Sequence, residues 1–369
     1  MTPAFDSETR LMLIAPHPDD ESVACGVILQ RAVQAGAAIR VIYATDGDNN
    51  PWPQRVLQRK WRLDELDRRR WGQLRRQEAL DALSVMGIRQ CDTSFLQLPD
   101  QGLTDLLMRD CESILGLFAG VISDWTPTHL LLPSLADTHP DHNALAVMLN
   151  LVLRNLPPYD LPMSVLSFVT HGRRSALSDR STCLRQTPRE TAIKLAAISC
   201  HKTQLKLSRG RFVGYAGRPE YFSVAGLDEA GVGPIHSASR SSSRLELELR
   251  PAATPFFWMQ PRLLILGHRP RGDIAALIMP LSFPSHPVEL FDYKSGLHLG
   301  SALCRGNRFS IVKITIPLDT FSIEHELFVK LDRRAIFFDE AGWLEIPPLT
   351  VATHSNAARL LEAASVAVS

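Results

Sequence analysis

Two short segments of this chain combine histidine with paired carboxylates, the residue types that bind metal ions and move protons. One is PHPDDE at residues 16–21, directly after the apolar run 11–15, and the other is DTHPDH at residues 137–142, after the apolar run 129–133. Taken alone, the first segment fits an acidic helix N-terminus equally well, because Asp and Glu complement the helix dipole there. Two such segments, each after a predicted strand, are much harder to explain by helix capping.

One histidine and one aspartate from the first segment and one histidine from the second make a three-ligand set of nitrogen and oxygen donors. His139 and His142 are three residues apart and would lie on one side of a helix's first turn. Catalytic zinc sites use such a set and keep a fourth position for water, whose pKa the ion lowers to about 7. Iron or cobalt fits the same ligands, so the sequence predicts a divalent-ion site without deciding the metal.

The other polar residues of these segments have roles in the same chemistry. A carboxylate next to a ligand, but not itself bound, can take a proton from the attacking water, a contribution of ~10²–10⁴ in rate. His139 lies close enough in sequence to neutralise negative charge on the attacked oxygen. Asp141 or Asp137 would hold a histidine ring in the required tautomer.

The elements that would position these segments alternate between strand and helix. Strands are predicted at 11–15, 39–44, 94–98, 129–133 and 163–170, and helices at 22–35, 74–86, 104–118, 144–153 and 191–205. This alternation predicts an α/β domain with a Rossmann-like, mostly parallel sheet and helices on both faces. Ligands of such sheets bind beyond the carboxyl ends of the strands, where both metal-binding segments begin.

The character of the sequence changes after about residue 225. Ser237–Arg244, with the sequence SASRSSSR, is predicted to be a flexible linker. Strand-like runs follow at 245–250, 263–266, 275–279, 288–291, 309–316 and 326–331, with Pro and Gly between them. They predict a C-terminal all-β, sandwich-like module. The predicted divisions are residues 1–235 for the α/β domain, 236–350 for the β module and 351–369 for an Ala-rich tail.

Composition excludes several classes of protein. The chain has 369 residues, of which 45% are hydrophobic, and a formal net charge of +1, which argues against disorder and against nucleic-acid coating. Its longest apolar run, Ile114–Ile122, is far shorter than the about 18 residues of a membrane span. The six cysteines form no C-x-x-C pair, which is typical of reduced thiols, so we expect a cytoplasmic protein. Association with the inner membrane surface stays open, as does the oligomeric state.

Residues 51–76 concentrate positive charge and tryptophan. They hold nine Lys and Arg against three acidic residues, and three of the six tryptophans: Trp52, Trp61 and Trp71. We expect this segment at the mouth of the pocket, where its charge would attract an anionic substrate and its rings would stack on a sugar or rest on lipid. A solvated, partly helical insertion is the alternative.

The two metal-binding motifs, in this order, resemble the PIG-L/LmbE-like family of zinc-dependent N-deacetylases. Further similar pieces follow in the family's order: TDG at 45–47, RRQEA at 75–79, LPDQGL at 98–103, and Lys194 with HKTQ at 201–204. The resemblance spans about residues 10–225 and does not include the β module. Pro16 stands where many relatives have a small residue, a difference at the entry of the loop that leaves its ligands intact.

The resemblance implies a role for each matching residue of the two motifs. His17, Asp20 and His142 would bind one Zn²⁺ ion. Asp19 would be the general base that deprotonates the metal-bound water. His139 would be the electrophilic or acid partner of the tetrahedral intermediate.

The resemblance also implies a substrate. Arg75 would contact it or the developing oxyanion, and Asp100 would bind a sugar hydroxyl. The reaction would be hydrolysis of the N-acetyl amide of an N-acetylglucosamine-type glycoconjugate, either an anionic lipid-linked or nucleotide-linked compound of the cell envelope or an intermediate of secondary metabolism. A glycan-binding or scaffold protein descended from a deacetylase is one alternative, although the intact metal ligands and presumed base argue against it. A metal phosphoesterase is another, although two-metal sites need more bridging carboxylates.

A few other polar residues carry weaker expectations. His129 and His171 are predicted to be structural, and His201 a packed histidine. Asp46 lies in a T-D-G sequence after a strand, where an aspartate either lines a site or simply stabilises the turn. Glu78 shares a helix face with Arg75, and an ordinary surface pair would explain that spacing.

Overall fold

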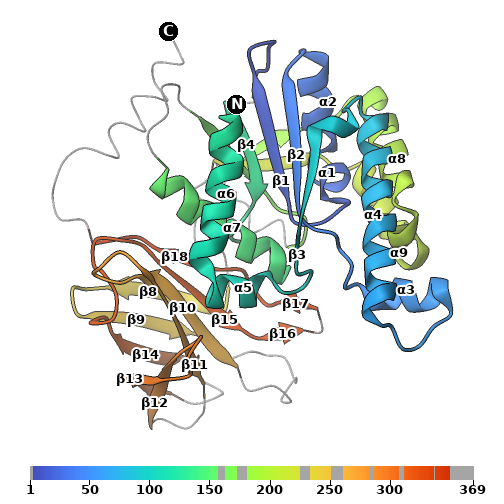
Figure 1. The fold of residues 1–369 in the computed structure, drawn as a ribbon. Coiled ribbons are helices and arrows are strands. Elements are labelled where there is room, and N and C mark those ends of the chain that lie inside the picture. Colours follow the sequence, from blue (N-terminus) through green and yellow to red (C-terminus); the bar gives the residue numbers. More distant parts are fainter. Residues whose placement is uncertain are drawn as a thin grey trace.

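The computed structural model shows an α/β domain and a β module in contact with each other (Figure 1). The residues that the structure describes are 3–156, 163–172, 181–224, 233–250, 261–281, 286–306, 311–335 and 337–349. The predicted tail at 351–369 and the first two residues of the strand predicted at 309–316 lie outside them. Within these ranges no helix is both long and apolar enough to cross a bilayer.

The α/β domain is built on a seven-stranded sheet with the order β3-β2-β1-β4-β5-β7-β6. The strands are β1 (Arg10–Ala15), β2 (Ala38–Thr45), β3 (Thr93–Leu98), β4 (His129–Pro133), β5 (Ser164–Phe168), β6 (Thr182–Leu184) and β7 (Glu220–Val224). β1 to β5 are parallel, and β7 and β6 add an antiparallel edge. The central strand β1 is buried from Leu11 to Ala15, because helices cover both faces. The predicted mostly parallel sheet is therefore confirmed.

Helices pack on both faces of this sheet. One face carries α1 (Asp20–Val23), α2 (Gly26–Gln34), α4 (Glu65–Val85) and α8 (Pro188–Cys200), and the other α5 (Leu103–Arg109), α6 (Cys111–Trp125) and α7 (Pro140–Asn155). α3 (Pro51–Gln58) and α9 (Lys202–Ala216) pack against each other. Three predicted helices are each divided in two. The clearest division is at His201, which leaves the helical path to hydrogen-bond Glu21.

The β module contains one nine-stranded antiparallel sheet with the order β18-β15-β10-β11-β12-β13-β14-β9-β8. Its strands are β8 (Ile235–Arg240), β9 (Arg244–Leu249), β10 (Arg262–His268), β11 (Ile274–Pro280), β12 (His286–Asp292), β13 (His298–Arg305), β14 (Val312–Pro317), β15 (Leu327–Asp332) and β18 (Leu344–Ile346). The edge strands β18 and β8 contact each other, so the sheet curls into a nearly closed barrel. The all-β module is confirmed, but its core lies inside one curled sheet rather than between two facing sheets.

The linker predicted at Ser237–Arg244 is wrong, because half of it belongs to β8. Ser237 to Arg240 pair with β9, and only a tight turn at 241–243 separates the two strands. The serines are compatible with a strand because β8 lies at an exposed edge of the sheet, where backbone pairing with β9 does not require apolar side chains. β13 was not predicted, because its alternation is interrupted by Gly and Ser. The predicted domain boundary at 235/236 stays a prediction and lies one residue into β8.

The β module packs on the α5–α7 side of the α/β domain. β10 has two apolar faces: Leu263 and Ile265 point into the barrel core, whereas Leu264 and Leu266 join the cluster that includes α7. β15 behaves in the same way, with Phe328 facing α7. This contact explains why β10 and β15 lack the polar face of a free antiparallel strand. It also brings the short hairpin β16 (Arg334–Ala335) and β17 (Phe338–Asp339) to the carboxyl edge of the parallel sheet.

Candidate metal and catalytic site

The two segments predicted to bind a metal ion meet where the strand order of the parallel sheet reverses. β1 pairs with β2 on one side and with β4 on the other, so the chain leaves these neighbouring strands in different directions. Crevices of this kind are the usual ligand sites of open α/β sheets. Asp20 begins α1 after β1, and His142 lies in the first turn of α7 after β4.

Three donor atoms converge in this crevice. His17 Nδ1 lies 3.2 Å from His142 Nε2 and 3.6 Å from Asp20 Oδ2, and His142 Nε2 lies 3.3 Å from the same oxygen. Ligands about 2.0–2.1 Å from a tetrahedral zinc ion are separated by about 3.3 Å. The spacing of the three atoms therefore fits a tetrahedral divalent ion with one position left over.

Each of the two histidines has a carboxylate on its other ring nitrogen. His17 Nε2 lies 3.2 Å from Asp141 Oδ2 and 3.2 Å from Asp100 Oδ1, and His142 Nδ1 lies 3.2 Å from Asp137 Oδ2. Carboxylates in this position fix the tautomer of metal-binding histidines and turn the free nitrogen toward the ion. These contacts orient both rings so that the remaining nitrogen of each faces Asp20.

Four carboxylates are buried around the two histidines of this site. Asp20, Asp137 and Asp141 are essentially inaccessible, and Asp100 is buried beside them. Burial opposes ionisation of Asp20, but His142 and His17 outweigh it and lower the pKa of that carboxyl. Burial also disfavours charge on His17, yet the neighbouring carboxylates raise the pKa of its imidazole. A divalent ion would compensate the carboxylates directly, so the chemistry of the donor set also fits.

Other donors lie within reach of the same place. Three groups have donor atoms within 4.8 Å of one another: His17–His139–His142, Asp20–His142–His171 and His17–Asp100–Asp141. His17 and His142 each belong to two of these groups. His171, predicted to be structural, is therefore part of the site region.

Asp19 is held in a strained conformation next to these donors. Its φ of 133° is rare for a residue other than glycine. Glu21 Oε2 accepts the Asp19 N–H at 2.9 Å, and Arg75 Nη2 donates to Asp19 Oδ2 at 3.0 Å. Burial raises the pKa of Asp19 to about 6, although Arg75 acts in the opposite direction. The result is a carboxylate with the pKa of a useful general base, aimed at the site by two fixed contacts.

Arg75 is occupied with holding the loops of the site. Besides Asp19 it donates to Pro18 O at 2.6 Å and to Gly47 O at 2.7 Å. A Cβ at Gly47 would lie 1.8 Å from the guanidinium, so the T-D-G turn needs glycine for close approach. Asp46 does not line the cavity and pairs with Arg76 instead. The structure thus gives Arg75 a positioning role, and its predicted contact with substrate stays a prediction.

His139 and His171 line the cavity with pKa values that keep both rings neutral. Burial, followed by repulsion from His17, lowers the pKa of His139 well below its usual range. Its Nδ1 accepts the Asp141 N–H at 3.2 Å, so the ring proton of the neutral form is on Nε2. Burial lowers the pKa of His171 to about 4. Because His171 follows β5 at its carboxyl end, the rule used for the other two loops also points to it.

Two further buried contacts support the site from behind. Glu21 Oε1 accepts from Ser22 Oγ at 2.6 Å and lies 2.8 Å from His201 Nε2. Glu78 accepts from the N–H and hydroxyl of Thr203, at 3.0 and 2.6 Å, and so caps the first turn of α9. The surface-pair interpretation of Glu78 is therefore wrong, since the side chain is buried.

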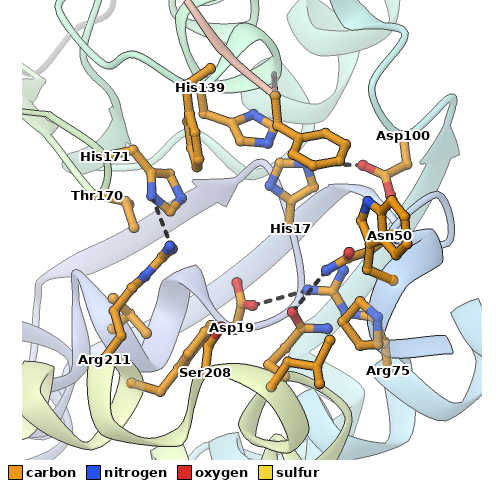
Figure 2. A pocket seen from close by; sticks show the side chains of 18 of the residues that line it. His17, Asp19, Asn50, Arg75, Asp100, His139, Thr170, His171, Ser208 and Arg211 are labelled. Atoms are coloured by element: carbon orange, nitrogen blue, oxygen red, sulfur yellow. Dashed lines mark hydrogen bonds and ion pairs between the residues drawn. The ribbon is translucent and has the colours of Figure 1, made fainter. Parts of the chain in front are cut away.

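The cavity above these residues has a volume of about 270 Å³ and a mixed lining. Figure 2 shows His17, Asp19, Arg75, Asp100, His139 and His171 facing a common space, with Arg211 at its side. Trp52 from the basic segment also lines it, whereas Trp61 is 74% exposed. The Arg55 guanidinium lies 5.1 Å from the Trp52 ring centroid and 5.3 Å from that of Trp61. Trp71 is only 2% exposed, so a contact of its ring with sugar or lipid is wrong.

Comparison with known proteins relates the α/β domain to deacetylases. Residues 12–152 match the sequence model of the PIG-L family, described as GlcNAc-PI de-N-acetylase. The probable N-acetyl-alpha-D-glucosaminyl L-malate deacetylase 2 of Bacillus cereus is 22% identical over 200 residues, which cover 53% of this chain and 84% of that protein.

Solved structures of similar fold include enzymes with different reactions. The N,N'-diacetylchitobiose deacetylase of Pyrococcus horikoshii is 17% identical, with a TM-score of 0.44 over 58% of this chain and 83% of its own. The 4-carboxy-2-hydroxymuconate hydratase GalB of Pseudomonas putida KT2440 is 19% identical, with a TM-score of 0.43 over 56% of this chain and 82% of its own. Likeness at this level says nothing about a substrate. Over residues 12–152, the sequence of the α/β domain therefore matches the PIG-L/LmbE-like family of GlcNAc de-N-acetylases.

Proposed function

We propose that this chain hydrolyses the N-acetyl amide of an N-acetylglucosamine-type glycoconjugate, with one Zn²⁺ ion bound by His17, Asp20 and His142. The observation that carries the proposal is the convergence of three donor atoms, 3.2–3.6 Å apart, beside the strained carboxylate of Asp19. The match to this family supports the same reaction class. The buried carboxylates on the far nitrogens of both histidines support a bound ion rather than a chance cluster.

The residues around the cavity can perform each proton movement of an amide hydrolysis. A bound Zn²⁺ ion would lower the pKa of water and polarise the amide carbonyl. Asp19 would take the proton of the attacking water and later deliver it to the departing amine nitrogen. His139, neutral and with its proton on Nε2, would donate a hydrogen bond to the oxygen that gains negative charge. The products are acetate and the free amino sugar.

The direct test combines metal analysis of the purified chain with acetate release from a panel of N-acetylhexosamine derivatives. We expect about one zinc ion per chain and acetate release from N-acetylglucosamine derivatives. Phosphate esters in the same panel test the phosphoesterase alternative. A chain that binds glycans but releases neither acetate nor phosphate when loaded with zinc, iron or cobalt would instead support the lapsed-enzyme alternative.

The basic segment supports an anionic substrate. Trp52 of α3 lines the cavity and Arg55 packs on its ring. The exposed cations of residues 59–70 follow in the connection after α3 and on α4. Charge attraction at exposed sites weakens as salt is added. For an anionic glycoconjugate we therefore expect KM to rise with ionic strength between low and physiological salt, while KM for a neutral analogue stays constant. An equal response of both substrates would contradict charge recognition.

The pH dependence of the reaction should report the ionisation of Asp19. Only the carboxylate accepts a proton, so kcat/KM should increase about tenfold per pH unit below the pKa of Asp19 and level off above it. That pKa is about 6 in the chain without metal, and a bound cation favours the carboxylate, which places the inflection at or below pH 6. Arg75→Met removes the cation that lowers this pKa and should move the inflection upward. Arg76→Met, the neighbouring cation paired with Asp46, should leave it in place.

A further inference from the structure

Exposed apolar side chains surround the mouth of a cavity whose floor is polar. Trp52 of α3, Leu207 of α9 and Phe337 of the β16–β17 hairpin all line the cavity and are 45%, 50% and 38% exposed. Deeper in the cavity, the lining changes to His17 and Asp19. Three elements from distant parts of the chain therefore place an apolar rim above a charged site.

The hairpin that carries Phe337 is hydrogen-bonded to the α/β domain, at and next to the DTHPDH motif, as well as to its own barrel. Asp339 N donates to Thr138 O at 2.8 Å, and Asn143 Nδ2 donates to Asp339 Oδ2 at 3.0 Å. Lys330, fully buried on β15, pairs with Asp339 and donates to Asn143 Oδ1 at 3.0 Å. Thr138 lies within the DTHPDH motif and Asn143 directly follows it, so the β module contacts the segment that holds His142.

A close backbone contact continues this attachment. Trp343 N donates to Leu135 O at 3.0 Å. A Cβ on Gly342 would lie 1.7 Å from the same oxygen, so only glycine allows this approach. The hairpin position is thus determined on both sides of Phe338 by the α/β domain.

Phe338 packs directly on the histidines of the cavity. Its ring centroid lies 5.7 Å from that of His139, edge to face, and 5.2 Å from that of His171. Phe338 is half-buried and Phe337 is exposed beyond it, so the two rings lead from the site to the rim. Aromatic rings at such a position offer large apolar contact area at low entropic cost.

We propose that the β16–β17 hairpin completes the substrate site and that Phe337 and Phe338 bind the apolar carrier group attached to the amino sugar. The proposal rests on the proposed function, because it assumes that the sugar occupies the polar floor. The cavity, at about 270 Å³, is just below the roughly 300–1,000 Å³ of pockets for whole small molecules. A glycoconjugate larger than one sugar must therefore extend onto the rim, where the apolar side chains of Trp52, Leu207 and Phe337 are exposed. A lipid chain and an aromatic aglycone offer the same apolar chemistry.

The test measures binding of three glycosides to the full-length, metal-loaded chain by calorimetry. The ligands are the methyl, octyl and 4-nitrophenyl N-acetyl-β-D-glucosaminides, and the chain carries Asp19→Asn to prevent turnover. We expect the octyl or nitrophenyl glycoside to bind more tightly than the methyl glycoside. Phe337→Ala and Phe338→Ala should each reduce that preference about five- to tenfold, as expected for loss of one aromatic contact. The apolar ligand with the larger loss identifies the carrier as lipid-like or aromatic.

A control variant tests whether the loss of preference is specific to the cavity, and a binding measurement does not depend on whether acetate is released. Leu297→Ala removes an exposed apolar side chain of the same β module outside the cavity, and should leave the preference unchanged. Because Phe337 is exposed, its variant should fold normally and carries the test if Phe338→Ala does not. Equal binding of all three glycosides by the parent chain, or an unchanged preference in Phe337→Ala, would overturn the proposal even if acetate is released. A preference that disappears in Phe337→Ala supports it even if the acetate assay fails.

Discussion

Asp19→Asn is expected to abolish most of the turnover while the chain still binds its metal. Asparagine has the same shape and tolerates positive φ better than most residues, so it can occupy the strained position at 133°. It cannot accept the proton of the attacking water, and loss of a general base costs ~10²–10⁴ in rate. Asp19 itself is absent from the three donor atoms that converge at 3.2–3.6 Å. The measurement is kcat for acetate release together with the zinc content of the same sample.

Asp46→Asn provides the matched control for this variant. Asp46 is also an aspartate in a loop after a parallel strand and is also paired with an arginine of α4, but it does not line the cavity. We expect its variant to keep activity within a few-fold of the parent. Turnover at the parent rate in Asp19→Asn would show that another group takes the proton.

The second large effect is expected for His142→Ala, which should lose the metal ion and, with it, the activity. His142 is fully buried, and its Nε2 lies within 3.3 Å of both other donors. Loss of an outer carboxylate partner reduces metal affinity about 10–100-fold, and loss of a ligand should exceed that range. Asp137→Asn, which alters the carboxylate on His142 Nδ1 but none of the three donor atoms, should therefore fall within it. The measurement is metal content after dialysis and competition against a chelator of known affinity.

Two other histidine variants make this result specific. His129→Ala changes a half-buried histidine at the start of β4, next to Thr128 and Phe5, and should retain the metal. His171→Ala tests whether the third ligand is His17 or His171, because His171 also forms a group with Asp20 and His142 in the structure. We expect it to keep most of its metal. A loss as complete as that of His142→Ala would replace His17 by His171 in the ligand set.

The sequence by itself was enough to place the two reactive loops on one edge of a parallel sheet. Runs such as Leu11–Ala15 and His129–Pro133 are continuous and apolar because both faces of their strands are covered, a local pattern that needs no tertiary information. Parallel strands align their carboxyl ends, so residues that follow them must share an edge. That rule places His17, Asp20 and His142 on one edge of the sheet, and the pairing of β1 with β4 in the folded chain brings them together.

Tertiary structure decided what surrounds those donors. From the sequence we predicted that Arg75 contacts a substrate, whereas in the folded chain it donates hydrogen bonds to Asp19 and two backbone carbonyls. His171 was predicted to be structural, but its ring faces the cavity. Contacts of this kind join residues tens of positions apart, and no periodicity within a strand or helix records them.

The β module illustrates the same limit on a larger scale. The alternation of Leu245, Leu247 and Leu249 predicts a strand with one buried face, but period two is identical in a sandwich and in a curled sheet. Only the pairing of strands far apart in the sequence decides how the sheet closes and where the hairpin at Phe338 lies. The sequence thus determined which groups can do chemistry and which edge they share, because these depend on local pattern. The depth of the cavity, the aim of its side chains and the aromatic rim depend on long-range packing, which only the folded chain specifies.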